Sequence, residues 1–219
     1  MNWSSIADVI PQYAHALALT AKLGFWGVFF SLFLGLLISL IQYRNIPVLE
    51  RICRIYIELS RNTPLLIQLY FLYYGFSKFG MKFSENTSAI IALTFLGASY
   101  MAEAFRGGLE AVPNSQLESG KAIGLNDRQL MRYVLLPQAV TVSVPAVGAN
   151  IIFLVKETSI LSAISILDVM NLTRDLIGMY YRTNEYLLLL VASYAILLIP
   201  LSLFLTWLER RVRRGAFGN

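Results

Sequence analysis

The sequence predicts an all-α integral membrane protein with five transmembrane helices, an N-terminal interfacial helix and one long polar helical segment between two spans. Hydrophobic residues make up 57% of the 219 residues. Charged residues make up only 14%, whereas an ordinary soluble domain has about 25%. Because the apolar residues gather in runs long enough to cross a bilayer, we expect the whole chain to form one transmembrane domain.

Each predicted span is an apolar run of roughly 20 residues, the length that crosses the hydrocarbon core as a helix. The spans comprise residues 20–42, 54–76, 87–105, 139–167 and 186–207. Residues 1–19 precede them, and we expect these residues to form an amphipathic helix at the membrane surface. The second span contains Glu58 and Arg61, and Pro64 is expected to disturb its helix.

The fourth predicted span is too long for one upright helix. Twenty-nine helical residues would reach about 43 Å, whereas the hydrocarbon core is ~30 Å thick. Two alternatives remain open. The helix tilts and protrudes, or it breaks near Lys156 and Glu157 and the segment that follows packs back.

The distribution of basic residues predicts the orientation. Lys and Arg are more frequent in the segments on the side of the C-terminus, which include Arg44, Lys121 and Arg210, than in the opposite segments. Cytoplasmic loops carry this excess, so we expect a multi-pass membrane protein with its N-terminus outside and its C-terminus in the cytoplasm. The net charge of +5 then reflects basic loops beside anionic lipid, and no nucleic acid is expected as a partner.

The sequence offers no residues for metal or nucleotide chemistry. With one cysteine and one histidine, Cys53 and His15, it lacks both an intrachain disulfide and a cluster with zinc-ligand spacing. It also lacks the G-x-x-x-x-G-K-[ST] phosphate loop and a nucleophile–base–acid set. We therefore expect a chain that is not an enzyme and binds no cofactor of its own.

The polar segment that precedes the fourth span is predicted to be a helix, a turn and a second helix. Gly124 is a suitable helix terminator, and Asn126 or Asp127 a suitable cap for the next helix. Pro137 marks the entry to the span. Periodicity alone leaves two interpretations, a compact docking knob for a soluble partner or an amphipathic helix at the lipid surface.

This segment resembles the "EAA" loop of ABC importer permeases. The family pattern is Glu-Ala-Ala, three residues, Gly, nine residues, Ile, one residue and Leu-Pro. Glu118, Gly124 and Leu136-Pro137 match it, and Val134 replaces Ile. Ser119 and Gly120 depart from Ala-Ala but are small. The residues that the resemblance assigns to ATPase coupling are Glu118, Ser119, Gly120, Ala122, Gly124, Leu136 and Pro137.

Four further stretches are similar to the polar amino-acid uptake branch of these permeases: residues 56–75, 98–112, 156–164 and 208–211. The resemblance implies a permease subunit that pairs with an identical or paralogous permease and takes an amino-acid substrate across the lipid bilayer. It implies two cytoplasmic ABC ATPase subunits, which bind ATP and magnesium, and an extracytoplasmic solute-binding protein. Residues 107–138 would then be the cytoplasmic coupling loop.

The alternative function is a self-contained secondary amino-acid carrier that uses an ion gradient. A cytoplasmic docking knob distinguishes the two, because a carrier that works alone does not need one.

Ionisable groups within spans are costly and usually face a cavity or a partner, so they are the candidate substrate contacts. Lys156 could attract an α-carboxylate and Glu157 an α-ammonium group, with hydroxyls from Thr158 and Ser159. A buried ion network between spans is the structural alternative. Glu103 and Arg106 are three residues apart on one helix face, for which we favour a structural or gating pair.

Two further candidates come from the second span. Arg61 lies in a possible gate or binding notch formed with the following Asn-Thr-Pro, or it reaches to the membrane interface from a kinked helix. Gln68 is a polar residue at similar depth and a weaker candidate. The predicted substrate-binding set is therefore Lys156, Glu157, Thr158, Ser159, Arg61, Gln68 and Glu103.

Overall fold

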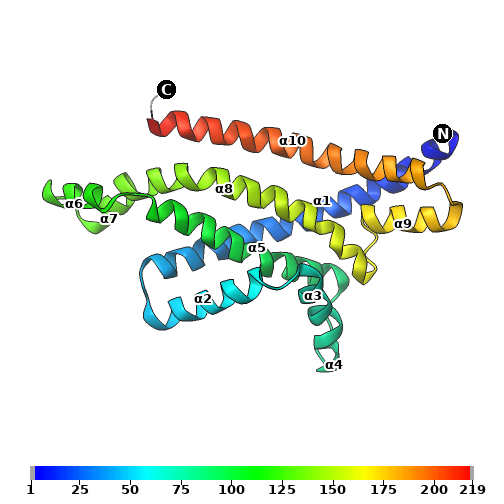
Figure 1. The fold of residues 1–219 in the computed structure, drawn as a ribbon, viewed down its shortest axis with the longest axis horizontal. Coiled ribbons are helices and arrows are strands. Elements are labelled where there is room, and N and C mark those ends of the chain that lie inside the picture. Colours follow the sequence, from blue (N-terminus) through cyan, green and yellow to red (C-terminus); the bar gives the residue numbers. More distant parts are fainter. Residues whose placement is uncertain (1–2, 218–219) are drawn as a thin grey trace.

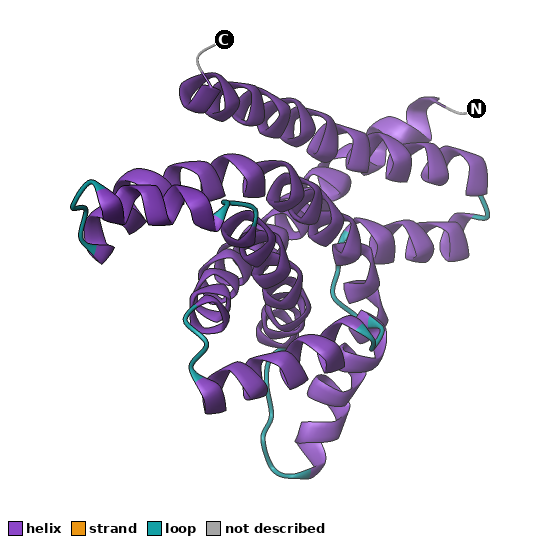
Figure 2. Ribbon diagram, turned by 60° about the vertical axis from the view of Figure 1, so that its left-hand side comes forward, coloured by secondary structure: helices purple, strands orange, loops and turns teal. Residues whose placement is uncertain are grey.

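The computed structural model describes residues 3–217, with side chains from residue 6 to residue 214, and these residues form helices and loops without a strand. The elements are α1 (Trp3–Tyr43), α2 (Pro47–Arg61), α3 (Leu65–Tyr70), the π-helical η1 (Phe71–Gly75), α4 (Phe76–Lys78), α5 (Glu85–Glu110), α6 (Asn114–Ala122), α7 (Asp127–Leu130), the π-helical η2 (Met131–Leu135), α8 (Leu136–Glu157), the 3-10 helix η3 (Thr158–Ile164), α9 (Val169–Tyr180) and α10 (Thr183–Phe217). Figure 2 shows how short the connecting loops are.

Four helical segments are long and apolar enough to cross a membrane: Ile6–Tyr43, Glu85–Glu110, Asp127–Ile164 and Thr183–Arg214. They correspond to the first, third, fourth and fifth predicted spans. The all-helical membrane class is thus confirmed within the described residues.

The second predicted span, residues 54–76, is not one helix. α2 ends at Arg61, and α3 begins at Leu65 after a turn. The physical cause is Pro64, which has no N–H to donate and excludes the helical conformation from the residue before it. The two pieces are each shorter than a span, so the predicted total of five continuous transmembrane helices is not reached.

Residues 3–19 do not form a separate helix before the first span, since they continue into it as the first half of the 41-residue α1. Packing explains the continuity. Val9, Tyr13 and Ala16 are buried against α9 and α10, and the Tyr13 hydroxyl lies 2.9 Å from Thr173 Oγ1. The amphipathic pattern that suggested a surface helix therefore marks a face buried against the protein itself.

α5 is the central helix, packed against α1 on one side and α8 on another. Leu23, Leu93 and Leu161 lie in the largest buried cluster, which joins α1, α5 and η3. Gly97 lets α1 approach α5 closely, because a Cβ at position 97 would collide with the Ser31 side chain. This close packing holds α5 in place, and α5 in turn provides residues of the candidate site described below.

The fourth predicted span breaks at its ionisable pair, as one of the two alternatives proposed. α8 ends at Glu157 and a 3-10 helix continues to Ile164. Ser165 then adopts the left-handed conformation, with φ 63°, and α9 begins after it. The buried side chain of Asp168 caps α9 by accepting from the Asn171 N–H at 2.8 Å. α9 itself was not expected from the sequence.

Figure 1 shows the arrangement along the long axis of the molecule. The α6–α7 hairpin, the α1–α2 turn and the late part of α10 lie toward one end. The start of α1 and the turn between α9 and α10 lie toward the other end, and α3 and α4 project to one side. The segments that are rich in Lys and Arg and were predicted to be cytoplasmic therefore lie at the same end of the molecule.

Candidate functional site

A cavity of about 340 Å³ lies where the chain breaks between α2 and α3. Its lining combines the break with α5, α8 and η3: Arg61, Asn62, Thr63, Pro64, Leu65, Leu66, Leu96, Tyr100, Phe153, Glu157 and Ile160. Its volume is at the small end of the range for ligand pockets. Two of the predicted substrate-binding residues, Arg61 and Glu157, are thus brought to one cavity from parts of the sequence far apart.

Arg61 is held at the cavity wall by α5. Its guanidinium lies 3.3 Å from the Glu103 carboxylate and 5.1 Å from the centre of the Tyr100 ring. Glu103 also pairs with Arg106 at 2.9 Å, and Arg106 with Glu110 at 2.8 Å. A chain of alternating charges therefore runs along α5 and ends at Arg61. Glu103 does not line the cavity, and its observed contacts match the structural pair favoured from the sequence.

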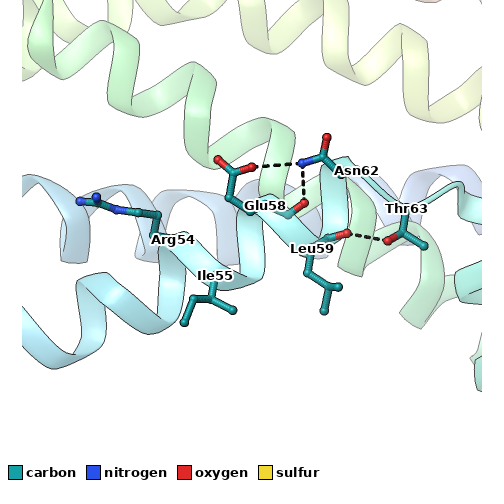
Figure 3. Close-up of a pocket in the computed structure, with 6 residues that line it drawn as sticks. All are labelled: Arg54, Ile55, Glu58, Leu59, Asn62 and Thr63. Atoms are coloured by element: carbon teal, nitrogen blue, oxygen red, sulfur yellow. Dashed lines mark hydrogen bonds between the residues drawn. The ribbon is translucent and has the colours of Figure 1, made fainter.

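Hydrogen bonds shape the break itself. The Asn62 side chain donates to the Glu58 backbone carbonyl at 2.8 Å and to the Glu58 carboxylate at 3.1 Å. The Thr63 hydroxyl donates to the Leu59 carbonyl at 2.8 Å. Figure 3 shows these bonds closing the last turn of α2. They add side-chain partners to carbonyl groups of the last helical turn, and the Glu58 carbonyl also accepts from the Asn62 backbone N–H.

A second, larger hollow of about 600 Å³ adjoins the first cavity, since both are lined by Asn62 and Thr63. Its other lining residues lie along α2. In Figure 3, Glu58 and Arg54 point to one side of the helix, and Ile55 and Leu59 to the other. The two hollows together follow α2 from its break toward its first turns.

Gln68 supports the break from α3. Its amide nitrogen donates to the carbonyls of Ser60 and Thr63, both at 2.9 Å. It lines a separate, mainly apolar cavity of about 460 Å³ and not the cavity of Arg61. Its geometry is that of a brace between α2 and α3.

Glu157 is the acidic group of the cavity. It is half-buried in the last turn of α8, and no hydrogen bond or ion pair to its carboxylate is found among the described side chains. Arg61 and Glu157 therefore present opposite charges in one small space. Such a pair suits a zwitterion, whose carboxylate and ammonium groups need one partner of each sign.

The remaining predicted contacts lie outside the cavity. Lys156 is exposed on the neighbouring face of α8. Thr158 is fully buried, and its hydroxyl donates to the Val155 carbonyl at 2.7 Å. Ser159 is half-buried in η3. The structure thus separates these three side chains from the space that Arg61 and Glu157 share.

The sequence reasoning did not identify Tyr100, Leu96, Phe153 and Ile160 as lining residues. Apolar and aromatic residues are common throughout spans, so their type carries no signal. Tyr100 was the exception that could have been found, because it lies one turn before Glu103 on α5.

The polar segment folds as predicted, as a helix, a turn and a second helix. Gly124 terminates α6 with φ 88°, its N–H bonding the Lys121 carbonyl and the next N–H, of Leu125, bonding Gly120. This is the Schellman pattern, which requires a left-handed residue after the helix. Asn126 then caps α7 in a capping box with Gln129.

The hairpin is packed closely, and its tip is apolar. Gly120 is buried, and a Cβ there would meet the flexible end of the Leu130 side chain, so α6 and α7 pack closely at this point. The Gln138 side chain in α8 bonds Gln116 at 2.5 Å and so ties α6 to the fourth span. Ile123, at the turn, has 79% of its surface exposed. The hairpin thus presents a large apolar side chain at its turn.

The other predicted coupling residues lie on α6 and at the start of α8. Glu118, Ser119 and Ala122 are exposed on α6, and a groove of about 390 Å³ beside Ile123 is lined in part by Ser119 and Gly120. Leu136 and Pro137 are exposed in the first turn of α8, where a proline is tolerated.

Comparison with known proteins shows similarity along nearly the whole chain. A family model described as "Binding-protein-dependent transport system inner membrane component" matches residues 27–214. The "Probable amino-acid ABC transporter permease protein PatM" of Vibrio harveyi is 29% identical over 217 residues, covering 98% of this chain and 97% of that protein. The octopine transport system permease protein OccM of Rhizobium radiobacter is 34% identical over 211 residues, covering 90% and 86%.

The fold has a close counterpart among solved structures. The chain described as "Crystal structure of an amino acid ABC transporter with histidines" superposes with a TM-score of 0.89 at 32% identity, covering 96% of this chain and 99% of that one.

Proposed function

The chain belongs to the family of binding-protein-dependent transport system inner membrane components, and on that premise we propose how it couples ATP hydrolysis to the passage of an amino acid. As an amino-acid ABC transporter permease it is the transmembrane component of such a system and not the subunit that hydrolyses ATP. We propose that the α6–α7 hairpin docks on the ATPase subunit and that the Arg61–Glu157 cavity binds the substrate.

The observation that carries the docking proposal is the exposed tip at Ile123 on a hairpin fixed at both ends. Gln116 and Gln138 join α6 to α8, and the buried Gly120 holds α6 against α7. A movement imposed at the tip would therefore reach α8 and with it Glu157, at the far end of the same helix. Rigid packing of this kind transmits displacement and does not absorb it.

The proposed complex has two ATPase subunits, which bind ATP and magnesium, and a second permease that is either a copy of this chain or a paralogue. An extracytoplasmic solute-binding protein delivers the amino acid. We place the α6–α7 hairpin and the C-terminus in the cytoplasm and the N-terminus outside, in the bacterial inner membrane. The gathering of the basic segments at one end supports that orientation.

In the substrate cavity, we assign the α-carboxylate to Arg61 and the α-ammonium group to Glu157. The cavity lies at the broken helix, and backbone interrupted at membrane depth is tolerated where it lines such a cavity. The hollow along α2 is the proposed continuation of the path toward the cytoplasm. Lys156, Thr158 and Ser159 then serve the path or the junction between α8 and α9, outside the first binding position.

The test of docking uses substitutions at Gly124, which has open space around it. Gly124→Arg adds bulk at the tip, whereas Gly124→Asn keeps a residue that tolerates the left-handed conformation. In proteoliposomes with the ATPase and the binding protein, we expect the Arg variant to lose substrate-stimulated ATP hydrolysis and uptake, and the Asn variant to retain most of both. Normal uptake by the Arg variant would exclude the hairpin as the docking element.

A further inference from the structure

The ion pair between Arg61 and Glu103 bears on how the amino acid is bound and released. Resting on the proposed function, which assigns the substrate α-carboxylate to Arg61, we propose that Glu103 is an internal competitor of that carboxylate. In the empty cavity Glu103 pairs with Arg61, a bound amino acid displaces it, and Glu103 returns when the amino acid leaves. Glu103 thus acts through Arg61 as a positioning residue, since its own side chain does not line the cavity.

Glu103 holds Arg61 by a slight contact. One guanidinium nitrogen of Arg61, Nη1, donates to Glu103 Oε2 at 3.3 Å, and the centre of the Tyr100 ring lies 5.1 Å from the guanidinium carbon. No other polar contact of this guanidinium is found among the described residues. A guanidinium carries five N–H donors in a planar fork, so Arg61 retains donors with which to bind a ligand carboxylate through two parallel hydrogen bonds.

Glu103 does not depend on Arg61 for its own pairing. Its Oε1 accepts from Arg106 Nε at 3.1 Å, and its Oε2 accepts from Arg106 Nη2 at 2.9 Å. This two-point contact is the geometry of the strong arginine–carboxylate pairs. Loss of the longer contact to Arg61 leaves both oxygens of Glu103 paired, so a ligand can displace this carboxylate from Arg61 at little cost.

Arg61 has the opposite requirement. It has no second ion pair, and an ionisable group within a membrane-spanning protein is costly when it lacks a partner. An amino acid that leaves the cavity would leave the guanidinium with the Tyr100 ring alone, whose attraction for a cation is modest. Because Glu103 lies within reach, Arg61 exchanges one carboxylate for another and is never left unpaired. The exchange makes release easier and binding weaker.

The two carboxylates compete because they carry the same charge. A ligand carboxylate on the Arg61 fork would lie close to Glu103, and the repulsion between like charges is screened less in a partly buried site than in bulk water. The bound amino acid therefore favours the arrangement in which Glu103 contacts Arg106 alone. Removal of the Glu103 charge should consequently strengthen substrate binding, whereas a purely structural ion pair would weaken binding when it is lost.

The test compares amino acids with their α-carboxamides, which lack the carboxylate for which Glu103 is the competitor. The probes are the common amino acids and the amides of those that bind, for example arginine and argininamide. Binding is measured by calorimetry on the permease–ATPase complex in lipid nanodiscs, without the solute-binding protein. We expect Glu103→Gln to bind amino acids about two- to fivefold more tightly than the wild type, because the competing pair is partly exposed and of modest strength. We expect no gain for the amides.

Release provides a second measurement, and Glu110→Gln provides the matched control. Glu103→Gln should lose a preloaded radiolabelled amino acid more slowly than the wild type, by a factor similar to its gain in affinity. Glu110→Gln removes the other carboxylate that pairs with Arg106 on the same helix and has no contact with Arg61. Its affinity and its rate of release should equal those of the wild type.

Three outcomes overturn the inference and leave the proposed function intact. They are unchanged or weakened amino-acid binding by Glu103→Gln, an equal gain of that variant for the amides, and an equal gain by Glu110→Gln, which would indicate a general effect of charge on α5. Thermal unfolding of each variant verifies that the fold is retained. Failure of every common amino acid to bind the wild type overturns the proposed substrate cavity itself.

Discussion

The Arg61 guanidinium at the end of α2 lies 3.3 Å from the Glu103 carboxylate on α5. The pair joins the broken second helix to the central helix of the bundle at the wall of the candidate cavity. Because Glu103 is in turn paired with Arg106, the position of Arg61 depends on a chain of charges on α5. Arg61 thus has a fixed location although the chain loses its helical form directly after it.

Substitutions at these two residues should have unequal effects on substrate affinity. We expect Arg61→Met to weaken amino-acid binding more than tenfold, because it removes the partner of the α-carboxylate. Glu103→Gln keeps the shape of the side chain and removes a partly exposed ion pair, worth about 0.2–1 kcal/mol, so affinity should change less than about fivefold. Calorimetry on the permease–ATPase complex measures both. Equal losses would contradict this ranking and show that binding depends on Glu103 as much as on Arg61.

Two neighbouring glycines in α5 provide a test of helix packing. A Cβ at Gly108 would lie 2.5 Å from the Ala139 carbonyl oxygen, whereas one at Gly107 would have no atom within 4 Å. Backbone atoms cannot move aside cheaply, so Gly108→Ala should separate α5 from α8 and destabilise the protein by about 1–3 kcal/mol. Thermal unfolding in detergent should show a lowered midpoint for Gly108→Ala. Gly107→Ala is the control, and its midpoint should equal or slightly exceed that of the wild type because alanine favours the helix.

The predicted role of Lys156 can be separated from that of the cavity. Lys156 is exposed at the end of α8, and a charge at that depth is costly unless it faces water or another protein. We expect Lys156→Met to slow uptake while the dissociation constant of the permease for its amino acid changes less than about twofold. If both uptake rate and affinity stay at wild-type values, Lys156 has no part in the translocation path.

The sequence was sufficient for the membrane class and for the four long spans, because apolar length is a local property. The coupling hairpin was also predictable, since Gly124 and Asn126 carry local conformational rules. Two features depended on distant contacts and were missed or misjudged. Residues 3–19 belong to α1 because α9 and α10 cover their apolar face. α9 begins after the break that follows α8, and the Asp168 side chain caps its first turn.

The candidate site likewise contains residues that the sequence could identify and residues that only the fold could identify. Arg61 and Glu157 could be chosen from the sequence because ionisable groups within spans are rare and costly. The choice of Lys156 alongside Glu157 was natural for adjacent residues, yet adjacent helical residues point in different directions. Phe153, three residues before Lys156 and four before Glu157, lines the cavity with Glu157. The spacing of four residues places Phe153 and Glu157 on one face of the helix. Only the structure shows that this face of α8 is turned toward the cavity.

Asp168 should make stability depend on pH. Burial raises its pKa to about 7, against the opposing effect of hydrogen bonds from the N–H groups of Asn171 and Met170 and of the charge of Arg174. Its Oδ2 has no hydrogen-bond partner among the described residues, and the Tyr194 side chain is near enough to interact with it electrostatically.

The direction of the pH effect follows from the pKa of Asp168 in the folded protein and in the unfolded chain. The folded protein binds the Asp168 proton more tightly than the unfolded chain, whose aspartates titrate near 3.9, so unfolding becomes easier as pH rises from about 4 to about 7. Above that range the full loss applies, no more than about 4 kcal/mol at 1.36 kcal/mol for each pKa unit. Asp168→Asn keeps the capping oxygen and carries no proton that titrates. We therefore expect its unfolding midpoint to exceed that of the wild type at pH 8 and to converge with it at pH 5. A wild-type midpoint that stays constant between pH 5 and 8 would contradict the raised pKa of the buried Asp168 carboxyl group.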